Sequence, residues 1–233
     1  MNLKAIGKKF GLVLAATGVG LMSTPSLASV ELTQAPLFLS QPVRPLVMLN
    51  MSNDHQLYFK AYDDYSDLTG NGVADTTYVH EHDYYGYFDS RKCYRYRSSN
   101  GRFQPTRFVD PDGYCNAGST SNEWSGNFLN WASMTRIDAV RKILYGGLRV
   151  VDTEEVTVLE RSFLPQDAHS FAKYYAGSDL PRLTPYNGDL GATNAVARGI
   201  TMCNTTNPSE RQQYSQDVTD PPKMLVAQGN YSL

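Results

Sequence analysis

The stretch from Ser125 to Asp152 constrains the fold of this chain more than any other. Ser125 or Asn127 can cap the start of a helix, and Gly146 with Gly147 predicts its end. The residues just after these glycines, 148–151, are typical of a short buried strand. A helix that leads through glycines into a strand is half of an α/β unit, so we predict an α/β fold. The apolar residues that recur at helical spacing, on one predicted stripe, are Phe128, Leu129, Ala132, Ile137, Val140 and Leu144.

The first 28 residues have the layout of a signal peptide. Lys4, Lys8 and Lys9 form a basic start, residues 11–22 are an apolar run, and residues 26–28 are small enough for cleavage. The apolar run is too short to span a bilayer. We therefore expect an exported protein that is cleaved after Ala28 and has no transmembrane segment once the signal is removed.

Length and charge narrow the class of protein further. The chain has 233 residues, 41% of them hydrophobic, which suits one globular domain with a core. The formal net charge of −2 gives no electrostatic support for a nucleic-acid partner, and we identify no direct nucleic-acid site.

Export gives the three cysteines a specific meaning. Cys93 and Cys115 enclose a loop, and in an oxidising compartment a disulfide between them is expected to contribute about 3 kcal/mol. Cys203 is then left over, and its partner could lie in another chain or beyond Leu233. The sequence ends at Leu233 within a largely apolar segment, which we interpret as the end of a truncated gene product or of a partial sequence.

Local patterns give a coarse secondary structure. We predict a buried strand at 44–50, hairpin strands at 76–79 and 84–88, a strand at 155–163 and a helix at 167–175 that Asp167 caps. The region between the two cysteines is rich in Gly, Pro, Ser and Arg, so we expect a loop held by the disulfide. Residues 177–233 are expected to be irregular.

One acidic loop has the spacing of a calcium site. Asp67, Thr69, Asn71 and Asp75 occupy positions one, three, five and nine of an EF-hand-type loop, and the carbonyl of Val73 could add a ligand. Gly72 stands where such a loop turns sharply, but Tyr78 stands where a bidentate carboxylate is usual. Asp63 or Asp64 could compensate from outside the loop. The alternative is a plain Asn-Gly turn flanked by solvated carboxylates.

A second group of polar residues lies at 80–83. If this segment were a strand, His80 and His82 would share one face, which is a transition-metal arrangement, although a solvated strand face explains the same pattern. The chain contains no Gly-x-Ser-x-Gly, no His-Glu-x-x-His and no phosphate-binding glycine loop. We therefore expect no enzyme, and keep a secreted metal-dependent hydrolase that uses His80 and His82 as the alternative.

Three longer passages resemble one protein family. They are Ala61–Tyr78, Tyr85–Asp89 with Lys92–Tyr94, and Ser125–Leu144, and they are similar to the PilC/PilY family of type IV pilus tip-associated proteins. The resemblance implies a non-enzymatic, exported protein at the pilus tip that contacts minor pilins and a host or abiotic surface. It also implies roles in pilus biogenesis, adhesion, twitching motility and, in some bacteria, DNA uptake.

The same resemblance implies a domain layout. A partial von Willebrand factor A-like domain, which is a doubly wound α/β sheet, would occupy residues 44–176 after an extended lead-in at 29–43. It would carry a large hairpin and disulfide insertion at 55–124, and a truncated irregular segment would follow at 177–233. The family is longer and carries a C-terminal β-propeller, which this sequence lacks, so a non-functional remnant of a pilus gene is a further alternative.

An A-like domain usually starts a metal-ion-dependent adhesion site with Asp-x-Ser-x-Ser. Here Asn50, Ser52 and Asp54 stand at these positions, and the neutral Asn50 lowers the charge of the site. The resemblance thus implies a degenerate adhesion site at most.

Overall fold

The computed structural model describes residues 46–48, 50, 54–116, 122–165, 167–205 and 222–231. The chain divides into two units, residues 1–50 and 51–233. Residues 46–48 and 50 of the first unit have no regular structure, and the side chains of Leu46, Val47 and Met48 are exposed. The predicted buried strand at 44–50 is therefore wrong for these residues, because no strand pairs with them. The predicted signal peptide and lead-in lie outside the described residues.

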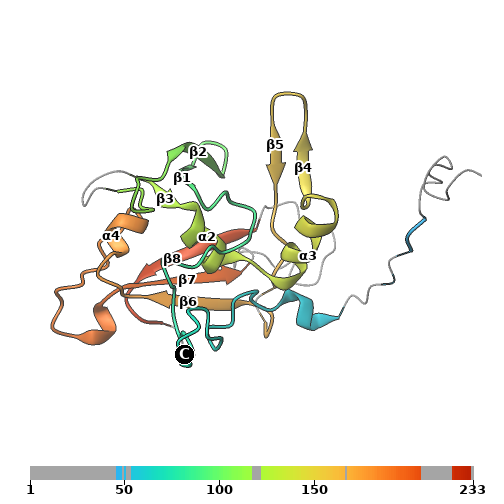
Figure 1. Ribbon diagram of the computed structural model, residues 1–233. Coiled ribbons are helices and arrows are strands. Elements are labelled where there is room, and N and C mark those ends of the chain that lie inside the picture. The colour runs from blue at the N-terminus through green and yellow to red at the C-terminus, as the bar shows by residue number, and fades with distance from the viewer. Residues whose placement is uncertain are drawn as a thin grey trace, which may run out of the picture. The chain divides into compact units, whose positions relative to one another are not determined.

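The second unit combines short helices with three small sheets (Figure 1). One sheet has the order β2-β1-β3, one pairs β4 with β5, and one has the order β6-β7-β8. The strands are β1 (Lys92–Arg97), β2 (Arg102–Phe108), β3 (Trp124–Ser125), β4 (Arg149–Asp152), β5 (Thr157–Leu159), β6 (Phe171–Tyr175), β7 (Ile200–Thr205) and β8 (Lys223–Gln228). The helices are α2 (Gly126–Ser133), α3 (Arg136–Tyr145) and α4 (Leu180–Leu183), with 3₁₀ turns η2 (His55–Tyr58) and η3 (Ala195–Ala197).

Every strand pair among the described residues is antiparallel. The α/β class is confirmed in this coarse sense. The predicted doubly wound arrangement needs parallel strands joined by helical crossovers, and the described strands form none. The chain instead forms hairpins and short sheets around α2.

The predicted helix within 125–145 is two helices rather than one. Ser125 caps α2 by accepting the amide of Phe128, at 3.4 Å, as predicted. The helix stops at Met134, and Thr135 starts α3 by accepting the amide of Asp138, at 3.2 Å. Because the axis breaks there, α2 is buried along nearly its whole length, whereas Val140 and Leu144 fall outside the core. Gly146 ends α3 in the left-handed conformation, with φ of 87°, as predicted.

The strand after these glycines is not a buried strand of a parallel sheet. β4 turns back at residues 153–156 and pairs antiparallel with β5, so the two form a hairpin that projects from the rest of the unit (Figure 1). Val150 and Val156 are 46% and 48% exposed. The prediction of a buried strand at 148–151 is therefore wrong. A run of apolar residues does not by itself specify which part of the protein covers it.

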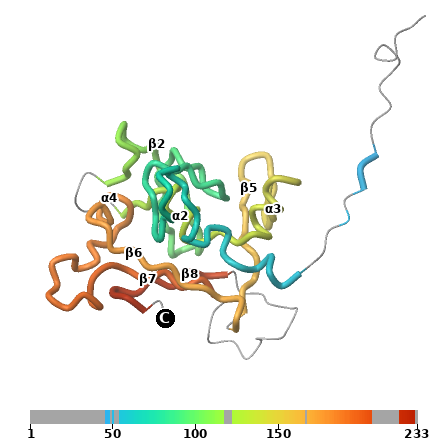
Figure 2. The backbone as a smooth tube through the Cα atoms, turned by 60° about the horizontal axis from the view of Figure 1, so that its bottom comes forward, coloured from blue at the N-terminus to red at the C-terminus, as the bar shows by residue number. Residues whose placement is uncertain are grey.

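The C-terminal region contains more regular structure than predicted. Residues 171–175 form β6 rather than the end of a helix, because alternate side chains such as Lys173 and Tyr175 face the core. Residues 200–205 and 223–228 form β7 and β8, which we expected to be irregular. β7 lies at the centre of its sheet, with Ile200 and Met202 fully buried, and Figure 2 shows the three strands side by side.

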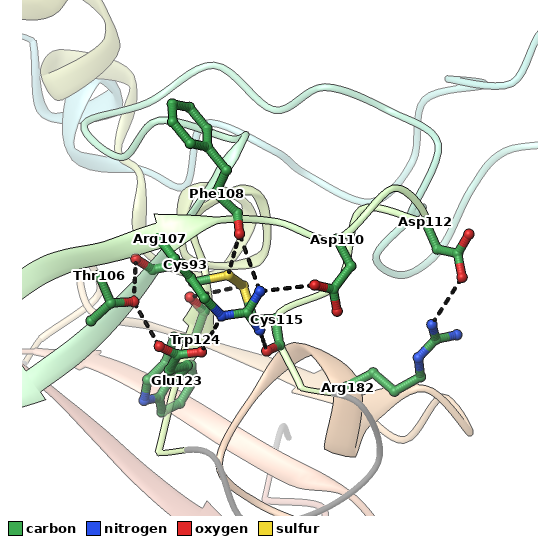
Figure 3. Close-up of polar contacts among 10 residues, drawn as sticks. All are labelled: Cys93, Thr106, Arg107, Phe108, Asp110, Asp112, Cys115, Glu123, Trp124 and Arg182. Atoms are coloured by element: carbon green, nitrogen blue, oxygen red, sulfur yellow. Dashed lines mark hydrogen bonds and ion pairs between the residues drawn. A yellow bond between two sulfur atoms is a disulfide. The ribbon is translucent and has the colours of Figure 1, made fainter.

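The region between Cys93 and Cys115 is also more regular than predicted. It contains the β1–β2 hairpin, and the predicted disulfide between Cys93 and Cys115 is present. Next to it, Arg107 forms ion pairs with Glu123, at 3.0 Å, and with Asp110, at 2.9 Å (Figure 3). Arg107 also donates to the carbonyl of Cys115. Covalent and ionic links therefore tie the chain after β2 back to β1 and β3.

The core is built mainly from aromatic rings that surround α2. Tyr78 and Tyr84 are buried, but residues 76–79 and 84–88 form no strands, contrary to prediction. Asparagine side chains of α2 form hydrogen bonds with the backbone of Tyr84 instead. The side-chain oxygen of Asn127 accepts the backbone amide of Tyr84, at 2.7 Å, and the side-chain nitrogen of Asn130 donates to the Tyr84 carbonyl, also at 2.7 Å. The members of this core are Tyr78, Tyr84, Tyr94, Trp124, Phe128, Leu129, Trp131, Ala132, Tyr175, Leu180, Leu183, Ile200 and Met202.

Candidate functional site

The acidic loop predicted to bind calcium is ordered around two of its carboxylates. Asp67 accepts the backbone amides of Asn71, at 3.0 Å, and Gly72, at 2.7 Å. Asp75 accepts the amides of Leu68, at 2.7 Å, and Thr69, at 3.2 Å. Residues 66 and 75 form an isolated antiparallel bridge that closes the loop. The carboxylates thus bind the backbone of their own loop and are not merely solvated groups beside a turn.

The left-handed backbone of the loop has a local cause. Gly72 has φ of 84°, a conformation that L side chains rarely adopt, and this turn brings its amide towards Asp67. The bond from Gly72 is the main influence that lowers the pKa of Asp67. The side chain of Asn71 adds a second constraint by accepting the amide of Val73, at 2.8 Å.

An ion pair anchors the base of the loop to the core. The ammonium of Lys173 on β6 lies 2.6 Å from a carboxylate oxygen of Asp64 and 2.5 Å from the carbonyl oxygen of Tyr62. The indole nitrogen of Trp131 donates to the other carboxylate oxygen of Asp64, at 2.8 Å. Lys173 is only 2% exposed, and its burial lowers its pKa to about 8 although Asp64 opposes this shift. The segment before the loop is therefore fixed to α2 and β6.

This anchor was only partly visible in the sequence. Asp64 was considered as an extra calcium ligand, but its carboxylate contacts Lys173 and Trp131 instead. Asp63 accepts the amide of Tyr65, at 3.1 Å. Residues 171–175 are mostly aromatic, and Lys173 lies among them. If this segment is taken as a strand, Lys173 falls on the same face as Tyr175, which would have identified it as a buried cation.

The oxygen atoms around the loop limit what it could bind. No group of three or more His, Cys, Asp or Glu side chains in the described part of the chain is arranged to hold a metal ion. A cation in the loop would therefore need Thr69, Asn71 and the carbonyl of Val73 besides the carboxylates of Asp67 and Asp75. Two carboxylates among neutral oxygens fit the hard-cation preference of calcium and favour weak binding.

The two histidines predicted to share a strand face do not lie on a strand. His80 lies in a turn, where its ring stacks on Tyr114 with centroids 4.0 Å apart. Its two ring nitrogens contact the carbonyl oxygen of Asp112, at 2.8 Å, and the hydroxyl of Tyr78, at 3.3 Å. His82 packs against Tyr84. The local aromatic packing accounts for both histidines, so the geometry gives no support to the hydrolase alternative.

The degenerate adhesion site falls partly outside the described residues. Ser52 is among the residues not described, and Asn50 and Asp54 belong to different units. Asp54 caps η2 by accepting the amide of Gln56, at 3.1 Å, and contacts His55.

Cys203 is a free, half-buried cysteine on β7. Burial raises the pKa of its thiol. This makes it less reactive than an exposed cysteine at neutral pH.

Comparison with known proteins places the chain in a family. A family profile described as "PilY1 homolog, small alpha/beta domain" matches residues 75–227. The chain belongs to the PilY1 homolog family. The matched range covers the aromatic core, the disulfide and all three sheets, and the mixture of small sheets and short helices agrees with the family description.

Two curated relatives from Xylella fastidiosa (strain Temecula1 / ATCC 700964) are both named "Type IV pilus biogenesis factor PilY1 homolog". One is 47% identical over 131 residues and the other 42% over 96 residues, which are 55% and 40% of this chain. Each aligned segment spans 8% of the relative's own length. No solved structure matches the chain. No helix in the described residues is long and apolar enough to cross a membrane.

Proposed function

We propose that the chain is part of an exported type IV pilus biogenesis factor that acts at the pilus tip, with minor pilins as its partners. The observation that carries this proposal is the 47% identity over 131 residues to a relative named for pilus biogenesis, together with the family profile that matches residues 75–227. A disulfide in the matched range supports export, because such bonds persist in oxidising compartments. Adhesion to a host or abiotic surface, twitching motility and DNA uptake follow as the activities to test.

The test is deletion of the gene in its native host, followed by complementation. Deletion should lower the amount of pilin in sheared surface fractions and the diameter of twitching zones, and DNA uptake should be scored in a competent host. Complementation with an Asn130→Ala variant should fail, since Asn130 holds the backbone of Tyr84 and Phe88. An Asn187→Ala variant, altered at an exposed loop position, should restore both readouts. Normal piliation and twitching after deletion would contradict the proposal.

We also propose that the acidic loop binds calcium weakly. Asp67 and Asn71 already impose a turn on the loop, and a bound cation would share their oxygens with the backbone amides that they accept. With only two carboxylates in the loop, we expect a dissociation constant in the range of extracellular modules, about 10⁻⁴ to 10⁻³ M. This range would suit a protein that works outside the cell.

Isothermal titration calorimetry of the purified protein tests this second proposal. Calcium should give a saturable heat in the millimolar range, and Asp67→Asn should abolish it. Asp189→Asn is the matched control, because Asp189 is an exposed aspartate on another loop and its loss should leave the heat unchanged. If calcium gave no heat, the proposal that the loop binds calcium would be contradicted, and the proposed pilus role would not be affected.

A further inference from the structure

A slot lies between the β4–β5 hairpin and the β1–β2 hairpin. It has a volume of about 940 Å³ and is bordered by residues 100–105 on one side and 155–161 on the other. Side chains of a strand alternate between faces, so a wall that presented one face of a strand would contribute every second residue. Here both walls contribute consecutive residues. The slot therefore reaches the main chain of β2 and β5, and Val150 and Val151 of β4 also line it.

The hydrogen bonds of the β4–β5 hairpin show which main-chain groups point into the slot. The carbonyl of Val156 accepts the amide of Thr153, at 2.9 Å, and the amide of Glu160 donates to the carbonyl of Leu148, at 2.9 Å. Even-numbered residues of this strand therefore point their polar backbone groups at β4. Because these directions alternate along a strand, Thr157 and Leu159 point their N–H and C=O groups away from β4. β5 thus offers the slot an open strand edge.

The other edge of the slot is less available. β2 is the outer strand of its sheet, but it contains Pro105, which has no N–H to donate. Proline on an outer strand blocks pairing with further strands. An added strand would therefore pair with β5, and its side chains would point alternately to the two faces of the extended sheet.

The interior of the slot combines apolar side chains with two arginines. Leu129, Met134 and Met224 contribute apolar surface, and Arg102 and Arg161 line it together with Glu155 and Glu160. Arg161 donates to the carbonyls of Thr205, at 3.0 Å, and Lys223, at 2.6 Å, and to the side-chain oxygen of Asn204, at 3.3 Å.

All three of these partners of Arg161 are neutral. Among the described residues, neither Arg161 nor Arg102 forms an ion pair within 4.0 Å, although Asp138 attracts Arg161 and Arg102 attracts Glu160 over longer distances; burial lowers the pKa of Arg161 to about 10. A carboxylate brought into the slot near Arg161 would stabilise this half-buried charge, and it would have to approach away from Glu155 and Glu160.

We propose that this slot binds an extended peptide segment that adds to the open edge of β5 and places an acidic side chain near Arg161. Main-chain hydrogen bonds to Thr157 and Leu159 would supply affinity, as in other cases of strand addition, and the arginine would select for the acidic residue. The inference goes beyond the proposed pilus role and does not depend on it, because any extended acidic segment would meet the same groups.

The proposal can be tested by nuclear magnetic resonance on the ¹⁵N-labelled protein. The probe is a capped six-residue peptide of alternating valine and threonine with one central glutamate, and the comparison peptide carries glutamine instead. The glutamate peptide should shift the amide signals of Thr157 and Leu159 and slow their hydrogen exchange. We expect the glutamine peptide to bind at least threefold more weakly.

Two proline variants provide the matched controls. Thr157→Pro removes a donor that faces the slot, and should abolish binding. Gln228→Pro removes an outward-facing donor at the exposed end of β8, and should bind like the wild type. The proposal is overturned if millimolar glutamate peptide leaves the β5 amides unperturbed, if both prolines act alike, or if sedimentation shows that a second copy of the chain already occupies the β5 edge.

Discussion

The surroundings of α2 and the β4–β5 hairpin both contain apolar residues but place them in opposite ways. Around α2, Trp131 and Phe128 are buried at 1% and 0% exposure, and asparagine side chains bind the irregular backbone that covers the helix. In the hairpin, Val150 and Val156 are about half exposed, and no strand among the described residues pairs with the second edge of β5. The difference indicates that the surroundings of α2 maintain the fold, whereas the hairpin offers the open edge at which we propose binding.

The largest expected effect is the loss of an aromatic ring beside α2. Trp131 packs against Phe128, at a centroid distance of 5.4 Å, and its indole donates to Asp64. Trp131→Ala should lower the free energy of unfolding by about 3–5 kcal/mol, because it creates a cavity and leaves Asp64 short of a donor. Urea denaturation followed by circular dichroism measures this. A loss below about 1 kcal/mol would mean that the aromatic cluster is not the main source of stability.

The disulfide should have the next largest effect. Cys93 and Cys115 are 22 residues apart, and removing such a crosslink costs about 3 kcal/mol in the loop-entropy estimate. A Cys93→Ala/Cys115→Ala double variant should show this loss in urea and should no longer respond to reductant. Cys203→Ala is the control, because that cysteine is free and its loss should leave the reductant response intact. If the double variant were as stable as the wild type, the disulfide would contribute nothing measurable to the stability of the domain.

Sequence alone identified the features that depend on near neighbours in the chain. The helix start at Ser125, the glycine stop at Gly146 and the disulfide are local, since each needs only a spacing, a cap or a cysteine pair. The resemblance to the family rests on three long sequence passages, and the match to the family profile confirms it.

The features that sequence missed depend on distant contacts. The break between α2 and α3 is set by Thr135, whose hydroxyl also contacts Ser162, 27 residues away, at 3.1 Å. Residues 171–175 form a strand rather than a helix because they pair with β7. Lys173 forms an ion pair with Asp64, which is 109 residues away in the sequence. Alternation over five residues cannot show which of these partners will be present.

Lys173 allows a test of the core by pH. Its folded pKa of about 8 lies below the usual lysine value of 10.5, so the unfolded chain binds more protons between these values. This group should therefore make the protein more stable as pH rises from about 8, by up to about 1.4 kcal/mol per pH unit. Buried tyrosines act in the opposite direction: burial raises the pKa of Tyr62 and Tyr84 to about 12, and stability should fall once unfolded tyrosines ionise near pH 10.

Urea denaturation between pH 8 and 9.5 isolates the lysine contribution. The wild type should gain stability across this window, and Lys173→Met should not, because methionine keeps the apolar stem without a titrating group. Lys223→Met, altered at an exposed position on β8, should keep the wild-type slope. Equal slopes for wild type and Lys173→Met would show that Asp64 compensates the buried ammonium fully.

The smallest effect should come from the hairpin. Val150→Thr and Val156→Thr replace half-exposed valines by residues of similar shape and strand preference, so each should change the free energy of unfolding by less than about 0.5 kcal/mol. Hydrogen exchange should meanwhile show the hairpin amides opening well below the global unfolding free energy, since an isolated two-stranded sheet is marginally stable. Slow exchange at Thr157, or a loss of several kcal/mol in either variant, would mean that the hairpin is already part of the core. In that case its open edge could not serve as the binding surface that the contrast with α2 implies.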